Sequence, residues 1–288
     1  MKWEGHRQSD RVDDLRTGAA GRPRRVGGGG LSLGGIVIAL IAAWLFGINP
    51  MTVLGLLGEG AQPELAQTAP GPLAQDEATR FTATVLADTE DVWGAYFQRT
   101  GQPYEAPRLT LFREATPTEC GQGEAAMGPF YCPADQRIYL DLGFFDTLRT
   151  QLGAPGDFAQ AYVIAHEVGH HIQQQLGISA QVQQARQRAD PRRSNDLSVR
   201  LELQADCFAG VWAHHSQSGK GWLDASDVAE AMNAASQIGD DTLQRQSQGR
   251  VVPESFTHGS AAQRQRWFKT GLSAGRLEAC DTFAARNL

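Results

Sequence analysis

DFAQAYVIAHEVGHHIQQQL, at residues 157–176, is the most informative stretch of this chain of 288 residues. Asp157 with Gln160 resembles a capping box at its start, and Gly177 is suited to end a helix. Its apolar residues recur at the spacing of one helix face: Phe158, Ala161, Tyr162, Ala165, Val168, Ile172 and Leu176. The sequence therefore predicts a buried helix of about 20 residues.

The same helix carries an H-E-x-x-H motif at His166, Glu167 and His170. Residues four apart share a helix face, so both imidazoles can reach one zinc ion at about 2.0–2.1 Å. Glu167 is turned about 100° around the helix axis, where it can take a proton from zinc-bound water without being a ligand. His171 is predicted to lie at the surface or to support a ligand. The alternative is a pair of core histidines without a metal.

A third metal ligand is expected from ELQAD, residues 202–206, on a later predicted helix. Glu202 and Asp206 are four apart and so share a face. Glu202 is predicted to complete one catalytic Zn²⁺ site with His166 and His170. Asp206 is predicted to accept a hydrogen bond from the far nitrogen of His166, which would fix the tautomer of that ring.

A group that stabilises the oxyanion of a tetrahedral intermediate is expected in FTHGSAAQR. His258 is the leading catalytic candidate there, although a lone histidine before a helix is often only a cap. Arg264 is predicted to bond Glu202 or the substrate. Tyr131 and Tyr139 are weaker candidates for the same role.

Other patterned segments flank these motifs. A helix is predicted from about residue 76 to Gly101, and strands are predicted at RLTLFR (108–113) and RIYLDL (137–142). Further helices are expected over 143–153, from about residue 194, over 224–238 and over 260–272. The predicted fold class is α+β, mostly helical with a small β-sheet.

Composition narrows the class of protein. A hydrophobic content of 41% with 20% charged residues is typical of a globular chain. The formal net charge of -6 leaves no basic excess to neutralise phosphates, so nucleic acid is not an expected partner.

An uncharged apolar run, LSLGGIVIALIAAWLFGI, occupies residues 31–48 and is long enough to cross a bilayer. The sequence predicts a cytoplasmic basic tail at 1–30, a transmembrane anchor region at 31–57, a flexible linker at 58–76 and a zinc metallopeptidase domain at 77–288. The expected protein is single-pass in a bacterial inner membrane, with one helix in the lipid bilayer, its N-terminus cytoplasmic and its catalytic domain periplasmic or extracellular. A cleaved signal peptide is the alternative.

The four cysteines all lie beyond the apolar run, and an even number in an exported domain indicates two disulfides. Three pairings are possible. Cys120 with Cys132 would close a short glycine-rich loop, and Cys207 with Cys280 would tie the last segment to a central helix. Buried free thiols are the alternative.

Four stretches carry a resemblance to the bacterial neutral zinc metallopeptidases: GPFYCPADQRIYLDLGFF, GDFAQAYVIAHEVGHHIQ, ELQADCFAGVWA and FTHGSAAQRQRWF. The resemblance covers most of residues 76–284. It implies a zincin-like fold, a peptidase activity and a protein or peptide substrate. In similar folds the substrate adds a strand to a sheet edge, and RIYLDL is the expected edge.

The sequence thus predicts a membrane-anchored zinc endopeptidase that hydrolyses peptide bonds with a Glu-activated, zinc-bound water. A noncatalytic, zinc-stabilised protein-binding module of the cell envelope is the alternative. The presence of Glu167 favours the enzyme, because a structural zinc needs no base.

Overall fold

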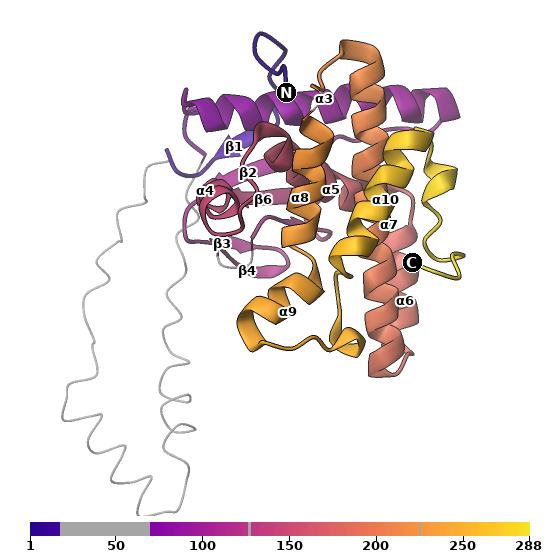
Figure 1. The fold of residues 1–288 in the computed structure, drawn as a ribbon. Coiled ribbons are helices and arrows are strands. Elements are labelled where there is room, and N and C mark those ends of the chain that lie inside the picture. Colours follow the sequence, from indigo (N-terminus) through magenta and orange to yellow (C-terminus); the bar gives the residue numbers. More distant parts are fainter. Residues whose placement is uncertain (18–69, 126–127, 225) are drawn as a thin grey trace, which may run out of the picture. The chain divides into compact units, whose positions relative to one another are not determined.

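The computed structural model describes residues 1–17, 70–125, 128–224 and 226–288 (Figure 1). Residues 1–17 fold together with residues 71–288 as one compact unit. This unit is mostly helical with a small sheet, so that part of the predicted fold class is confirmed.

The main sheet has four strands in the order β1-β2-β6-β5. Strands β1, β2 and β6 are parallel, and β5 runs antiparallel to β6. A separate antiparallel pair, β3 with β4, lies between β2 and β5 in the chain. The bounds are Val12–Asp14 (β1), Arg108–Phe112 (β2), Ala115–Thr118 (β3), Gly121–Glu124 (β4), Phe130–Cys132 (β5) and Arg137–Asp141 (β6).

The predicted strands at RLTLFR and RIYLDL are confirmed as β2 and β6, but RIYLDL is not an edge. Strand β6 is paired on both sides, and β5 is the edge strand beyond it. Strand β5 has only three residues between Pro129 and Pro133, which is too short for an alternating pattern to be visible in the sequence.

The helices follow the predicted order with different ends. Helix α7 begins at Pro191 rather than near residue 194, because the Asp190 side chain caps the Arg193 N–H. Helices α6 and α9 were not predicted, because Ile178 and Val182 are the only large apolar residues of α6 and Leu243 is the only one of α9. The bounds are Glu77–Thr100 (α3), Gly143–Thr150 (α4), Asp157–Gln175 (α5), Ile178–Gln187 (α6), Pro191–Lys220 (α7), Asp227–Gln237 (α8), Asp240–Gln248 (α9) and Ala261–Ala274 (α10), with short 3-10 turns at Pro253–Ser255 and Leu277–Cys280.

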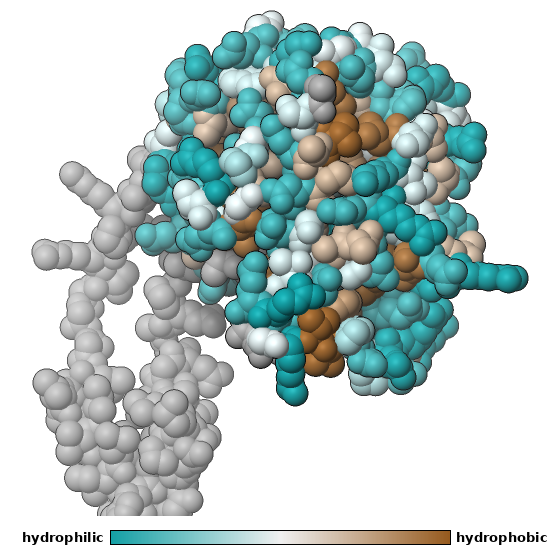
Figure 2. All heavy atoms as spheres, in the orientation of Figure 1, coloured by the Kyte–Doolittle hydropathy of each residue, from teal (hydrophilic) through white to brown (hydrophobic). Residues whose placement is uncertain are grey.

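The predicted helix over residues 157–176 is confirmed as α5, and it packs against α3, α7 and α8. Its residues Phe158, Tyr162, Val168 and Ile172 are completely buried. The face of the molecule in Figure 2 is mainly hydrophilic with small, separate hydrophobic areas. The apolar side chains of α5 are buried in a hydrophobic core that several helices share.

The start of α5 differs from the predicted capping box. Gly156 is the N-cap and has no side chain that could cap the helix, but the Glu230 carboxylate accepts a hydrogen bond from the Phe158 N–H at 3.2 Å. The Asp157 carboxylate instead accepts a hydrogen bond from the Trp3 indole N–H at 3.1 Å. A residue from the beginning of the chain therefore stabilises the first turn of the helix that carries the H-E-x-x-H motif.

Two predictions about the membrane are wrong: the fold class with a leading transmembrane helix, and the single-pass inner-membrane localisation. The predicted anchor at 31–57 lies outside the described residues, and no helix within them is long and apolar enough to cross a bilayer. Residues 1–17, expected on the cytoplasmic side, pair β1 with β2 inside the unit that contains residues 71–288. Two segments that pair in one sheet lie on the same side of a membrane, whereas a single span between them would place them on opposite sides.

Ion pairs join β1 to β2 and to β6. The Asp13 carboxylate accepts from Arg108 at 2.5 and 2.9 Å and from Arg137 at 2.5 Å. The hydrogen bonds from Arg108, opposed by burial and helped by Arg137, lower the pKa of Asp13.

We expect Asp13→Asn to reduce the free energy of unfolding by about 1 kcal/mol at pH 7. Because the folded-state pKa of Asp13 is depressed, its contribution is present above the ordinary carboxyl pKa and is lost as the pH falls. Urea unfolding should therefore show a difference between variant and wild type at pH 7 that shrinks below about pH 4. Asp10→Asn, on the exposed side of the same segment, serves as control. An equal effect of both substitutions would contradict the role of Asp13.

Candidate metal centre

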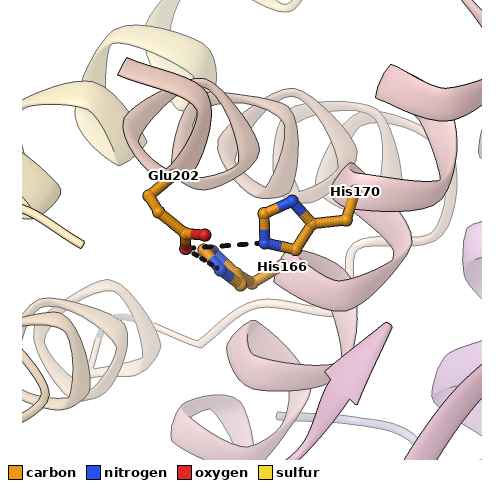
Figure 3. Close-up of side chains that lie close together, drawn as sticks. All are labelled: His166, His170 and Glu202. Carbon is orange, nitrogen blue, oxygen red and sulfur yellow. Dashed lines mark hydrogen bonds and ion pairs between the residues drawn. The ribbon is translucent and has the colours of Figure 1, made fainter. Parts of the chain in front are cut away.

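Three side chains from two helices converge on one point (Figure 3). Helix α5 contributes His166 and His170, and α7 contributes Glu202. The Oε2 atom of Glu202 lies 3.2 Å from Nε2 of His166 and 3.5 Å from Nε2 of His170. One ligand atom from each residue lies within 4.8 Å of the others. Two imidazole nitrogens and one carboxylate oxygen form a donor set that suits zinc and leaves a fourth position open.

A glycine allows the two helices to approach so closely. A Cβ atom on Gly169 would lie 2.9 Å from the carbonyl oxygen of Ala205 and 3.1 Å from its Cα. Any other residue at this position would push α5 away from α7. The glycine inside the H-E-x-x-H motif thus lets Glu202 reach the two histidines.

The far side of His166 is held by a buried ionic network. Its Nδ1 donates to Asp206 at 2.8 Å, and the same carboxylate accepts from Tyr162 at 2.5 Å. Arg264 forms two hydrogen bonds to Asp206, each of 2.9 Å. The sequence predicted that Arg264 would bond Glu202 or the substrate, but in the structure it bonds Asp206.

Charges in this network alter the pKa values of its members. Burial opposes charge on His166, but Asp206 outweighs it and raises the pKa of His166 to about 10. Burial would also raise the pKa of Asp206, yet Arg264 and His166 bring it down to about 2. For Glu202, burial is again outweighed, and the two imidazoles hold its pKa well below the usual range. Both carboxylates are therefore ionised at neutral pH.

His170 is supported by an amide rather than a carboxylate. Its Nδ1 lies 2.9 Å from Oε1 of Gln173, one helical turn further along α5. The Gln173 amide N–H₂ donates to the Leu201 carbonyl at 2.7 Å and to Gln204 at 3.1 Å, and this orients its oxygen toward His170. Sequence reasoning missed Gln173, although its position three residues after His170 places it on the same helix face.

We expect Gln173→Leu to weaken zinc binding by about 10- to 100-fold, because the orientation and tautomer of His170 would no longer be fixed. A competition titration with a zinc chelator would measure the change in Kd. Gln187→Leu, an exposed position on α6, makes the same chemical change away from the metal centre. Equal zinc affinities for the two variants would contradict the role of Gln173.

Glu167 faces a cleft of about 1260 Å³ that also contains His166, His170 and Glu202. Its side chain is buried, yet none of the described residues donates a hydrogen bond to its carboxylate. Burial raises the pKa of Glu167. A carboxylate without a protein partner beside a metal centre is available to take a proton from water.

The three candidates for oxyanion stabilisation, His258, Tyr139 and Tyr131, differ in the hydrogen-bond partners of their polar atoms. His258 lines the cleft and is exposed, and its Nδ1 lies 3.0 Å from the Thr257 hydroxyl and 3.4 Å from Asp240. The hydrogen bond to Asp240 raises the pKa of His258. Tyr139 donates to Asp135 at 2.7 Å and does not line the cleft. Tyr131 lines the cleft, and its hydroxyl lies 3.0 Å from Nδ1 of His171.

Two disulfides are present, Cys120–Cys132 and Cys207–Cys280. The first links the β3–β4 turn to the end of the edge strand β5. The second joins α7, one residue after Asp206, to the 3-10 turn near the C-terminus. Each disulfide therefore braces a segment next to the cleft.

The comparison with protein families agrees with this arrangement. Residues 1–283 match the family described as "Putative neutral zinc metallopeptidase". The chain belongs to this family. The match extends over the three metal-centre residues and over residues 1–17, so the family model covers both parts of the folded unit.

Two relatives of this chain illustrate how far the similarity extends. "Uncharacterized protein YpfJ" of Escherichia coli (strain K12) is 49% identical over 289 residues, covering 98% of this chain and 99% of the relative. "Uncharacterized protein Rv2575" of Mycobacterium tuberculosis (strain H37Rv) is 40% identical over 261 residues, covering 85% and 86%. No solved structure gives a significant match.

Proposed function

We propose that this metallopeptidase is a zinc-dependent endopeptidase that cleaves peptide bonds in its cleft. The proposal rests most on the close approach of His166, His170 and Glu202 in the cleft. Glu167 lines the same cleft, and no described residue donates a hydrogen bond to its carboxylate. The donor set fits zinc in a catalytic site, where three protein ligands leave one position open. When bound there, zinc would polarise the substrate carbonyl and lower the pKa of water.

The residues of the chain would divide the remaining work. Glu167 takes a proton from the attacking water and later delivers it to the leaving amine. Asp206 and Gln173 hold the two histidines in the orientation that presents Nε2 to the metal. His258 can donate from Nε2 to the developing oxyanion when its ring is protonated on both nitrogens, a form that the hydrogen bond from Nδ1 to Asp240 favours by raising the pKa of His258.

The substrate would bind along β5 in place of the β6 edge expected from the sequence. Strand β5 is paired with β6 on one side, and no backbone hydrogen bond joins its other side to a described residue. Phe130 and Tyr131 of β5 line the same cleft as the metal centre. An extended peptide added to this edge would pass the metal with its backbone recognised by hydrogen bonds.

Metal removal tests the proposal. The purified protein should bind about one zinc ion per chain and cleave an unfolded protein such as fluorescein-labelled β-casein. Dialysis against a chelator should remove cleavage, and added zinc should restore it. A protein that binds zinc and binds casein but never cleaves it would instead support the noncatalytic binding module.

A further inference from the structure

His171 follows the second metal-binding histidine and is completely buried on α5. Its Nε2 lies 2.6 Å from the Glu105 carbonyl oxygen, and its Nδ1 lies 3.0 Å from the Tyr131 hydroxyl. One imidazole therefore joins α5 both to the loop before β2 and to the edge strand β5.

The Glu105 contact fixes the direction of both hydrogen bonds. A carbonyl oxygen can only accept, so the hydrogen of the neutral imidazole is on Nε2 and Nδ1 is the acceptor. Tyr131 consequently donates its hydroxyl hydrogen to His171. In this geometry the Tyr131 hydroxyl has no hydrogen left for an oxyanion, and its role is to hold the strand.

Aromatic packing restrains the imidazole further. The Tyr131 and Tyr104 rings contact it edge-on, with centroid distances of 5.5 and 6.4 Å. Gln175 donates to the same Glu105 carbonyl at 2.7 Å, which fastens the loop to α5 a second time. His171 is thus held in one orientation by neighbours on two sides.

Strand β5 needs such an attachment, because it has only three residues and one paired edge. Its last residue, Cys132, is tied by a disulfide to Cys120. Its central residue, Tyr131, is opposite Ile138 in the register with β6 and is tied by its hydroxyl to α5. The residue at the centre of β5 is therefore bonded to the helix that carries His166 and His170.

We propose that His171 is a positioning residue that locks the edge strand β5 to the metal-bearing helix α5 through Tyr131, so that an extended peptide is aligned with the metal centre before it binds. The part of this proposal that concerns the alignment of a peptide rests on the proposed peptidase function. The lock itself is a property of the fold and can be tested without catalysis.

The test uses near-isosteric substitutions of His171 in the full-length, zinc-loaded protein. His171→Asn keeps an acceptor close to the position of Nδ1, whereas His171→Leu has none. Tyr131→Phe removes the donor, and Tyr139→Phe makes the same change on β6, where the hydroxyl bonds Asp135 and not α5. For each variant we would measure the zinc content and the amide hydrogen exchange of residues 130–132. Binding of fluorescein-labelled β-casein would be measured on proteins that also carry Glu167→Gln, so that the casein is not cleaved.

We expect His171→Leu and Tyr131→Phe each to accelerate exchange at residues 130–132 and to raise the Kd for casein by about five- to tenfold, with zinc content unchanged. His171→Asn should recover most of both losses, and Tyr139→Phe should change neither. In variants without Glu167→Gln, KM should rise more than kcat falls. Unchanged exchange in His171→Leu would overturn the lock. Altered exchange without casein binding by any variant would overturn the substrate role and the proposed function, and leave the lock in place.

Discussion

Glu167→Gln is expected to abolish most peptidase activity while leaving zinc bound. The amide is close to the carboxylate in size but cannot accept a proton from water, and general-base catalysis typically contributes about 10²- to 10⁴-fold to a rate. The three proposed metal ligands and the residues that hydrogen-bond to them are untouched by this change. Casein cleavage and zinc stoichiometry, measured on the same preparation, would separate the loss of the base from the loss of the metal.

Glu278→Gln is the matched control for this prediction. It makes the same chemical change at an exposed position in the 3-10 turn near the C-terminus, outside the cleft. The control should cleave at the wild-type rate. Wild-type activity in Glu167→Gln would exclude Glu167 as the base, and a loss of zinc in that variant would show that Glu167 contributes to metal binding.

Among the substitutions proposed for this protein, Arg264→Met is expected to cause the largest loss of stability, about 3–5 kcal/mol in the free energy of unfolding. Arg264 and Asp206 are both buried, and Asp206 accepts two hydrogen bonds from the guanidinium group. Removal of the arginine leaves a buried carboxylate with only Tyr162 and His166 to compensate it. Urea unfolding of the metal-free protein would measure the loss without a contribution from zinc.

Arg266→Met is the matched control, because Arg266 lies two residues later on α10 and is exposed. Its effect should stay within about 0.5 kcal/mol. Adding Asp206→Asn to Arg264→Met should recover part of the stability, since the uncompensated charge is then gone. Equal stabilities of Arg264→Met and Arg266→Met would contradict the proposed network.

Local patterns in the sequence were sufficient for the main helices and for the motif residues. The spacing of His166 and His170 follows from the pitch of one helix, and the apolar stripe of α5 identifies its buried face. The partner of Arg264 could not be predicted in the same way. Its choice of Asp206 over Glu202 depends on how α10 lies against α7, which is a tertiary property that no spacing within either helix encodes.

The parts of the sheet that were mispredicted have weak local signals. Strand β1 has three residues, two of which are Asp13 and Asp14, and it is held by arginines far away in the chain. Residues 1–17 were predicted to belong to a basic tail at 1–30, next to the apolar run. In the structure the Arg16 guanidinium forms an ion pair with Asp14, so its positive charge stabilises the folded unit.

The pairing of β1 with β2 also determines where the chain leaves and re-enters the fold. The Gly71 N–H donates to the Asp14 carbonyl at 3.0 Å, and the Thr17 hydroxyl donates to the Pro72 carbonyl at 2.7 Å. Residues 18–70 are thus an insertion between two neighbouring points of one domain. The entropy of closing a loop grows only with the logarithm of its length, so a link of about ten residues in place of about fifty would change the closure cost by only about 1.5 kcal/mol. The number of residues between these two points can therefore change at little thermodynamic cost to the folded unit.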